Sequence, residues 1–210
     1  MIYKVLVAED EFIDKIYRES LDDLNKFYEI NWIYDLPKVV IVDDRKTIDS
    51  WKQKKTEPWL VGWTEGRTVY VLNRENLEKE SEHKYSDETY YALVKHELSH
   101  CFYHILSNNK HKPIWLTEGV AIYTSGQNQF KKKPDEFSKF LQFYDNGGSA
   151  VYSESGFAVE SLIKEYGKPK LFELIKGLQH VNSEKEFSVL FAKIYSIQLS
   201  YENFNIIFQK

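Results

Sequence analysis

The sequence predicts an α+β fold, with a small mixed β-sheet and helices in the N-terminal lobe and helices alone in the C-terminal lobe. Three observations predict it. Short segments of alternating hydropathy, separated by turn residues, precede residue 73. A long run with helical character follows at 90–106, and beyond residue 114 the strand signals fade while helical spacing dominates.

The first half of the chain is predicted to alternate between strands and helices. Residues 2–8 alternate as a strand does, and residues 11–30 repeat apolar side chains at helical spacing. Glu65-Gly66 is the predicted turn of a hairpin. The remaining elements are a strand at 38–43, a helix at 47–54 and the hairpin strands at 59–64 and 67–72.

The second half begins with the long helix. Ser86 is the predicted N-cap, and Asp87 and Glu88 fall in the first turn, where the helix dipole favours acidic side chains. Gly167 is expected to end one of the helices that follow. These later helices are predicted at 151–166, 169–178, 184–194 and 201–208.

The long helix carries the pattern H-E-x-x-H at His96-Glu97-Leu98-Ser99-His100. Residues four apart lie on the same side of a helix, one turn from each other, so His96 and His100 can bind one metal ion. Glu97 points to one side of this pair, where a carboxylate can hold a water on the metal as a general base. The pattern therefore predicts a zinc site with hydrolytic chemistry.

The rest of this helix separates the histidines from the expected core. Val94, Leu98, Cys101 and Ile105 form an apolar stripe, roughly 150° around the axis from the two histidines. Cys101 is the one cysteine of the chain, which excludes an internal disulfide, and we expect it in the core rather than on the metal.

A catalytic zinc has three protein ligands and one position for water, so a third ligand is required. His104 continues the four-residue spacing but lies two turns from His96, and we expect it at the surface or behind the ligands. His111, in a loop, stays open as a ligand. The metzincin pattern is excluded, because Tyr103 and Leu106 occupy its glycine and histidine positions.

The segment Trp115-Leu116-Thr117-Glu118-Gly119-Val120-Ala121, together with H-E-x-x-H, resembles the gluzincins, a family of zinc peptidases. The resemblance implies a zincin-like fold, one Zn²⁺ per chain and Glu118 as the third ligand beside His96 and His100. Ile122 stands where thermolysin-like enzymes carry an aspartate, so the resemblance is to the aminopeptidase-type branch. Thr117 stands where relatives often carry asparagine, which implies a side chain that orients a ligand histidine.

Downstream, residues 152–157 and 166–171 look like the gluzincin segment that carries a catalytic tyrosine. The resemblance implies that the Tyr152 hydroxyl binds the oxyanion that forms opposite the metal. Residues 62–66 faintly resemble the G-x-M-E-N segment of the aminopeptidases, but the methionine and asparagine are missing, and Glu65 fits the hairpin turn better.

The implied function is a zinc-dependent metallopeptidase whose partner is a peptide or protein substrate. Arg67, Val69 and Val71 alternate along the second hairpin strand, which we expect to be an edge strand along which a peptide adds. Two alternatives stay open at this point. One is a non-catalytic zinc-binding module for interaction or regulation, and the other is a zinc hydrolase of a small amide or ester.

Length, composition and charge predict the number of domains, the partners and the localisation. With 210 residues we expect one domain, 1–210, with lobes at about 1–110 and 111–210. A net charge of −4 predicts no nucleic-acid partner, and the basic run Lys131-Lys132-Lys133 is expected to be a solvated loop. No apolar run reaches the roughly 18 residues of a membrane span, and no signal-peptide pattern is seen, which predicts a cytoplasmic protein without a membrane partner.

Overall fold

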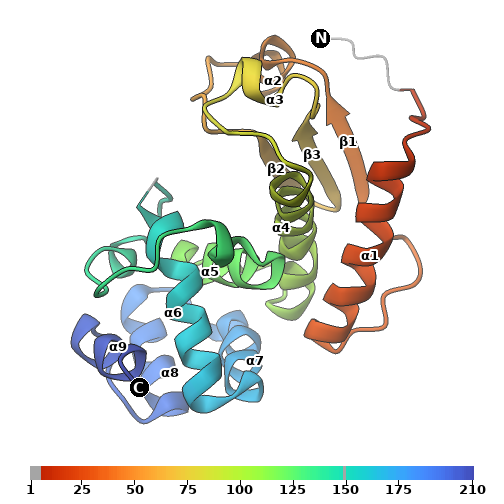
Figure 1. Ribbon diagram of the computed structural model, residues 1–210. Coiled ribbons are helices and arrows are strands. Elements are labelled where there is room, and N and C mark those ends of the chain that lie inside the picture. The colour runs from red at the N-terminus through yellow and green to blue at the C-terminus, as the bar shows by residue number, and fades with distance from the viewer. Residues whose placement is uncertain (1–5, 149) are drawn as a thin grey trace.

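The computed structural model describes residues 6–148 and 150–210 and confirms the α+β class (Figure 1). Its sheet has three strands in the order β1–β3–β2, with β3 parallel to β1 and antiparallel to β2. The strands are β1 (Lys38–Val42), β2 (Gly62–Glu65) and β3 (Thr68–Leu72). The predicted hairpin is therefore confirmed, and Gly66 in its turn has a φ of 61°, a backbone conformation that favours glycine.

The strand predicted at 2–8 falls partly on residues 1–5, which lie outside the described residues. Residues 6–8 are not in a strand, and Leu6 and Val7 are exposed. The prediction is therefore wrong for its described part. Alternation over so short a segment also suits an extended coil with no strand partner.

In the described part of the chain, three helices precede the motif helix. Asp10 caps α1 (Glu11–Tyr28), because its carboxylate accepts from the main-chain N–H groups of Phe12 and Ile13. Asp44 caps α2 (Arg45–Lys52) in the same way, and α3 (Leu77–Glu80) is a single turn. The predicted helices at 11–30 and 47–54 are confirmed within two residues at each end.

Helix α4 (Asp87–Leu106) carries the motif and joins the two halves of the molecule (Figure 1). The predicted cap is present, since Ser86 and Thr89 each accept a hydrogen bond from the main-chain N–H of the other. α4 packs against α1, β2 and β3 and, on another side, against α5. Its middle is consequently buried all round, whereas Ile105, predicted to be in the core, is exposed.

The second half is helical, as predicted. Gly167 ends α6 with a φ of 83°, and the four later helices match their predicted ranges within one residue. The elements are α5 (Ile114–Ser125), η1 (Gln127–Phe130), η2 (Phe140–Gln142), α6 (Val151–Tyr166), α7 (Lys168–Gly177), η3 (Leu178–His180), α8 (Glu184–Tyr195) and α9 (Tyr201–Phe208).

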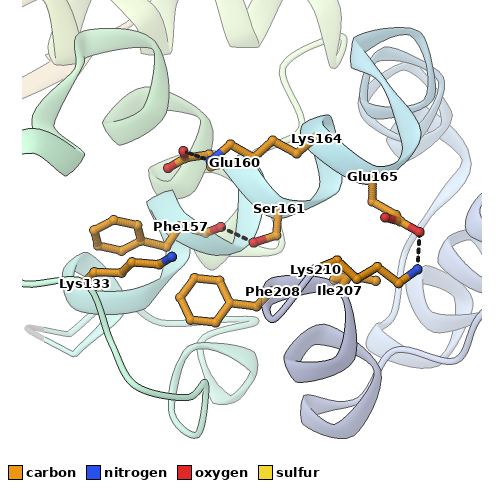
Figure 2. A pocket seen from close by; sticks show the side chains of 9 residues that line it. All are labelled: Lys133, Phe157, Glu160, Ser161, Lys164, Glu165, Ile207, Phe208 and Lys210. Atoms are coloured by element: carbon orange, nitrogen blue, oxygen red, sulfur yellow. Dashed lines mark hydrogen bonds and ion pairs between the residues drawn. The ribbon is translucent and has the colours of Figure 1, made fainter.

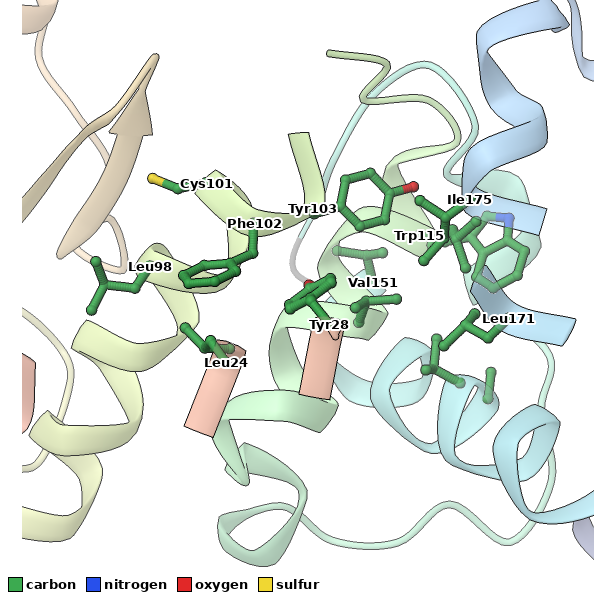
Figure 3. Packing of buried hydrophobic residues seen from close by; sticks show 14 of the residues in the cluster. Leu24, Tyr28, Leu98, Cys101, Phe102, Tyr103, Trp115, Val151, Leu171 and Ile175 are labelled. Carbon is green, nitrogen blue, oxygen red and sulfur yellow. The ribbon is translucent and has the colours of Figure 1, made fainter. Parts of the chain in front are cut away.

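Buried apolar residues from both halves form one continuous cluster. Figure 3 shows the part of it around Tyr28 of α1 and Phe102 of α4, whose stacked rings have centroids 5.6 Å apart. Farther along, Trp115 of α5 is 1% exposed and packs edge-on against Phe140. This packing holds α4 and α5, the two helices of the predicted site, on a common core.

Across residues 6–148 and 150–210, no helix combines the length and the apolar character needed to cross a bilayer.

Candidate metal centre

His96 and His100 lie one turn apart on α4 and direct their imidazoles to the same point. Their Nε2 atoms are 3.1 Å apart, and the ring planes meet at 84°. Both residues are buried. This juxtaposition follows directly from the four-residue spacing on a helix.

Glu118 brings a carboxylate to this pair from α5. Its Oε2 atom is 3.2 Å from His96 Nε2, and its Oε1 atom is 3.7 Å from His100 Nε2. Nitrogen and oxygen ligands about 2.1 Å from a tetrahedral ion stand roughly 3.4 Å from one another. The observed separations bracket that value, so the three side chains can hold one metal ion between them.

The unsatisfied atoms of this group also fit a metal ion. Glu118 Oε2 is buried and, apart from His96 Nε2 at 3.2 Å, has no hydrogen-bond partner among the described residues. A buried carboxylate oxygen without a donor is costly unless a cation compensates it. The Glu118 side chain remains 16% exposed, against 6% for His96, so the group is reached from the Glu118 side.

Charge within the group favours a cation. Burial lowers the pKa of His100 to about 4, so this imidazole is neutral near pH 7 and has a lone pair to donate. Burial opposes the charged form of His96, but the carboxylates of Glu118 and Glu97 outweigh it and raise the pKa of this imidazole. Burial likewise opposes the ionised form of Glu118, but His100 and His96 lower the pKa of its carboxyl.

A buried network of hydrogen bonds connects α4 to α1 and α5. Ser99, one residue before His100, has its Oγ atom 2.8 Å from the Tyr28 hydroxyl of α1. Thr124 of α5 donates a hydrogen bond of 2.8 Å to the same Ser99 oxygen. The two helices that supply the metal group are therefore tied together through a residue inside the motif.

Gly119, next to Glu118, allows α5 to approach α6 closely. A Cβ atom at Gly119 would lie 2.6 Å from the Ser155 carbonyl oxygen. The glycine of the Trp115–Ala121 segment thus has a packing reason, because a side chain there would push α5 away from α6.

Glu97 is held against strand β2 and is not one of the three clustered side chains. Thr64 Oγ1 lies 3.0 Å from Glu97 Oε2, and a Cβ atom at Gly62 would lie 3.0 Å from Glu97 Oε1. Burial raises the pKa of the Glu97 carboxyl to about 7, and the charge of Glu118 adds to this effect. A carboxyl group with this pKa can both accept and return a proton near neutral pH.

Tyr152 lies near the metal group, at the start of α6. Burial is the main cause that raises the pKa of its phenol, and the charges of Glu118 and Glu97 contribute. The hydroxyl is therefore within electrostatic reach of both carboxylates. Its catalytic role stays a prediction.

Thr117 was expected to orient a ligand histidine, and its hydrogen bonds differ from that expectation. Its hydroxyl donates to the His111 carbonyl oxygen at 2.9 Å and lies 3.4 Å from that of Pro113. The side chain fixes the start of α5, because threonine hydroxyls readily bond to main-chain carbonyls of the preceding turn.

The expected substrate strand requires a correction. β3 lies between β1 and β2, so it is the central strand rather than an edge strand. Val69 and Val71 are fully buried within it, and Arg67 lies in the turn before it and forms an ion pair with Asp35. β2 is the strand at the edge of the sheet next to the site, and the face that carries Gly62 and Thr64 contacts Glu97.

The other predicted residues of this region are spread around the metal group. The half-buried His104 and the exposed His111 are not among the clustered side chains. Cys101 is buried, as expected, and burial raises the pKa of its thiol to about 12. Glu65 accepts from Lys52 at 2.7 Å and from the Trp63 indole at 3.0 Å.

Three residues of this region were not identified from the sequence. Thr64 and Gly62 contact Glu97, but the sequence does not indicate this contact, because it depends on β2 packing against α4. Lys131, expected in a solvated loop, is partly buried, which lowers the pKa of its ammonium group, and its charge opposes the protonation of His96. Lys133, the last residue of the basic run at 131–133, lines a separate hollow.

That hollow, of about 610 Å³, lies between α6 and α9 (Figure 2). Its apolar lining includes Phe157 and Phe208, and Lys133 Nζ stands 4.5 Å from the centre of the Phe208 ring. An ion pair between Lys210 and Glu165 links its two sides, and Lys164 and Glu160 pair along α6 at 2.5 Å. None of the predicted site residues lines it.

Comparisons with known proteins do not name this site. No family model matches the chain, and no match was found among curated proteins or solved structures.

Proposed function

We propose that this chain is a zinc-dependent metallopeptidase with a gluzincin-type site and a zincin-like fold. The observation that carries the proposal is the placement of Glu97. It is buried beside the cluster of His96, His100 and Glu118, yet its carboxylate is held by β2 rather than by that cluster. A site that only bound a metal would have no use for a second carboxylate that is held separately and has a raised pKa.

His96, His100 and Glu118 would hold the Zn²⁺ ion, one per chain. When bound, the ion acts as a Lewis acid that polarises a substrate carbonyl and makes a water molecule acidic near neutral pH. Neutral imidazole and ionised carboxylate are both ligands that catalytic zinc prefers.

The remaining steps belong to the side chains of this chain. Glu97 accepts the proton of the attacking water and later returns it to the leaving amine of the peptide. Thr64 keeps the carboxylate of Glu97 oriented during both transfers. The Tyr152 phenol, which stays protonated because its pKa is raised, donates a hydrogen bond to the carbonyl oxygen as negative charge develops there.

The open edge of β2 supports a peptide as the substrate. β2 is the last strand in the order of the sheet and contacts Glu97 through Thr64, so an extended chain can add to its outer edge through main-chain hydrogen bonds. This edge takes over the role that the sequence had suggested for Arg67, Val69 and Val71.

The test starts with zinc stoichiometry on the parental protein and on Glu118→Ala. We expect one zinc per chain in the parental protein and a loss of at least tenfold in affinity in the variant. Full zinc in Glu118→Ala would remove Glu118 from the ligand set and return His104 and His111 as candidates.

The second step measures peptide hydrolysis by parental protein and Glu97→Gln, both loaded with zinc. Glu97→Gln should keep its metal and lose roughly 100-fold or more in rate, as expected for a general base. If the variant cleaves peptides at the parental rate, Glu97 is not the base. If zinc binds but the parental protein cleaves no peptide, the peptidase proposal fails.

A further inference from the structure

The loop before β2, residues 57–60, is held by side chains at each of its four carbonyl groups. Arg45 donates to the carbonyl oxygen of Glu57 at 3.2 Å, to that of Pro58 at 3.1 Å and to that of Leu60. His83 Nε2 donates to the carbonyl oxygen of Trp59 at 3.0 Å. Surface loops usually leave such groups to water and remain mobile, so this loop is unusually constrained.

The loop presents one large side chain to solvent. Trp59 is 39% exposed, although its main chain is fixed on both sides. Loss of indole exposure on binding a ligand is favourable, and a ring on a rigid loop gives up little conformational entropy when it binds. An exposed tryptophan on such a loop has the properties of a binding residue.

The location of Trp59 connects it to the metal group. Its ring centroid is 6.2 Å from that of Tyr152, with the two planes at 51°. Tyr152 in turn lies within electrostatic reach of Glu97 and Glu118. Three residues after Trp59, Gly62 lies directly against the Glu97 side chain. Trp59 from the sheet half and Tyr152 from the helical half therefore stand side by side next to the site.

We propose that Trp59 is a specificity-determining residue, whose indole packs against a large apolar side chain of the substrate next to the scissile bond. This inference rests on the proposed peptidase function. The paired rings of Trp59 and Tyr152 offer an apolar, polarisable surface suited to aromatic and branched aliphatic side chains.

The experiment compares peptides that differ in one residue beside the bond that the parental protein cleaves. Phe, Leu, Ala and Lys are placed at that position in turn, and kcat and KM are measured for parental protein, Trp59→Ala and Trp59→Phe. We expect the parental protein to prefer Phe and Leu over Ala by about tenfold or more in kcat/KM. Trp59→Ala should abolish this preference mainly through a higher KM, and Trp59→Phe should retain part of it.

Tyr34→Ala is the matched control. Tyr34 is 81% exposed in the loop between α1 and β1, and its replacement should leave all four peptides unchanged. Zinc stoichiometry is measured on every variant, so that loss of metal is not mistaken for loss of the contact between Trp59 and the substrate.

Two results would overturn the inference while leaving the proposed function intact. Trp59→Ala could lower cleavage of the Phe and Ala peptides by the same factor, or the parental protein could prefer the Lys peptide. If the zinc-loaded parental protein cleaves none of the peptides, the proposed function and this inference both fall.

Discussion

Thr64 and Glu97 are joined through a single hydroxyl group. Thr64 Oγ1 lies 3.0 Å from Glu97 Oε2 and 2.9 Å from the main-chain carbonyl oxygen of the same residue. One side chain of β2 thereby fixes both the carboxylate of the proposed base and the turn of α4 that carries it. The sheet contributes to the site by orienting this base.

The hydroxyl of Thr64 should matter for turnover and not for metal binding. Thr64→Val keeps the shape of the side chain and removes the donor, so we expect kcat/KM to fall roughly 10- to 100-fold with full zinc occupancy. This hydrogen bond also lowers the pKa of Glu97, so its loss should move the acidic limb of the pH–rate profile to higher pH. Thr64→Ser should restore most of the rate. Loss of zinc in Thr64→Val would contradict the separation of base from ligands.

Metal affinity should depend on pH through His96 rather than His100. The pKa of His96 is raised above its ordinary value of 6.5, whereas that of His100 is lowered to about 4. A protonated His96 competes with the metal, so zinc affinity should fall by about tenfold per pH unit below the raised pKa of His96. Competition with a chelator between pH 8 and pH 5.5 measures this slope.

Glu97→Gln serves as the control for that experiment, because it removes the other group that titrates near neutral pH. It should retain a dependence from His96, displaced to lower pH because the charge of Glu97 contributes to the raised pKa of that imidazole. An affinity that does not change over this pH range would contradict His96 as a ligand.

Gly119 should be intolerant of any side chain. A Cβ atom there meets a main-chain carbonyl oxygen at 2.6 Å, so Gly119→Ala must push α5 from α6. We expect a loss of about 2–4 kcal/mol in the free energy of unfolding, together with weaker zinc binding, because Glu118 moves with the helix. Urea unfolding and zinc titration measure the two effects.

Gly147→Ala is the matched control for Gly119→Ala. Its Cβ atom would find its nearest neighbour, Ile114 Cγ2, at 3.7 Å, which is ordinary contact. This variant should unfold within about 0.5 kcal/mol of the parental protein. Equal effects of the two substitutions would show that the close approach of α5 and α6 is not what makes Gly119 necessary.

The parts of the site that depend on local spacing were predictable from the sequence. His96 and His100 face one point because a helix brings residues four apart together, and the capping pair Ser86 and Thr89 fixes where that helix starts. Glu118 required a different argument, the resemblance of its segment to the gluzincins, since nothing local connects α5 to α4.

The parts that depend on long-range pairing were not predictable. Hydropathy identified the three strands, but their order follows from β1 pairing with β3, which buries Val69 and Val71 in the middle of the sheet. Thr64 reaches Glu97 across 33 positions of sequence, and no single-chain pattern links the two. The hydrogen bond of Thr117 was not predictable for a related reason, because its acceptor is the main-chain carbonyl oxygen of His111 in the turn before α5.

Arg45 should stabilise both the fold and the presentation of Trp59. Its guanidinium bonds to carbonyl oxygens in residues 57–60 and, at 2.9 Å, to that of Glu80. Arg45→Met removes all of these donors while keeping an apolar stem, and we expect a loss of about 2–3 kcal/mol in the free energy of unfolding. Hydrogen exchange of the amides around Trp59 should become faster than in the parental protein.

Arg18→Met is the control for Arg45→Met, because the Arg18 side chain is 79% exposed and forms an ion pair with Asp14 at 3.7 Å. Exposed pairs of this kind contribute about 0.5 kcal/mol or less, so this variant should unfold like the parental protein. If Arg45→Met leaves both stability and exchange around Trp59 unchanged, the loop is held by its own packing. Trp59 would then be rigid for a reason other than the three carbonyl groups that Arg45 bonds.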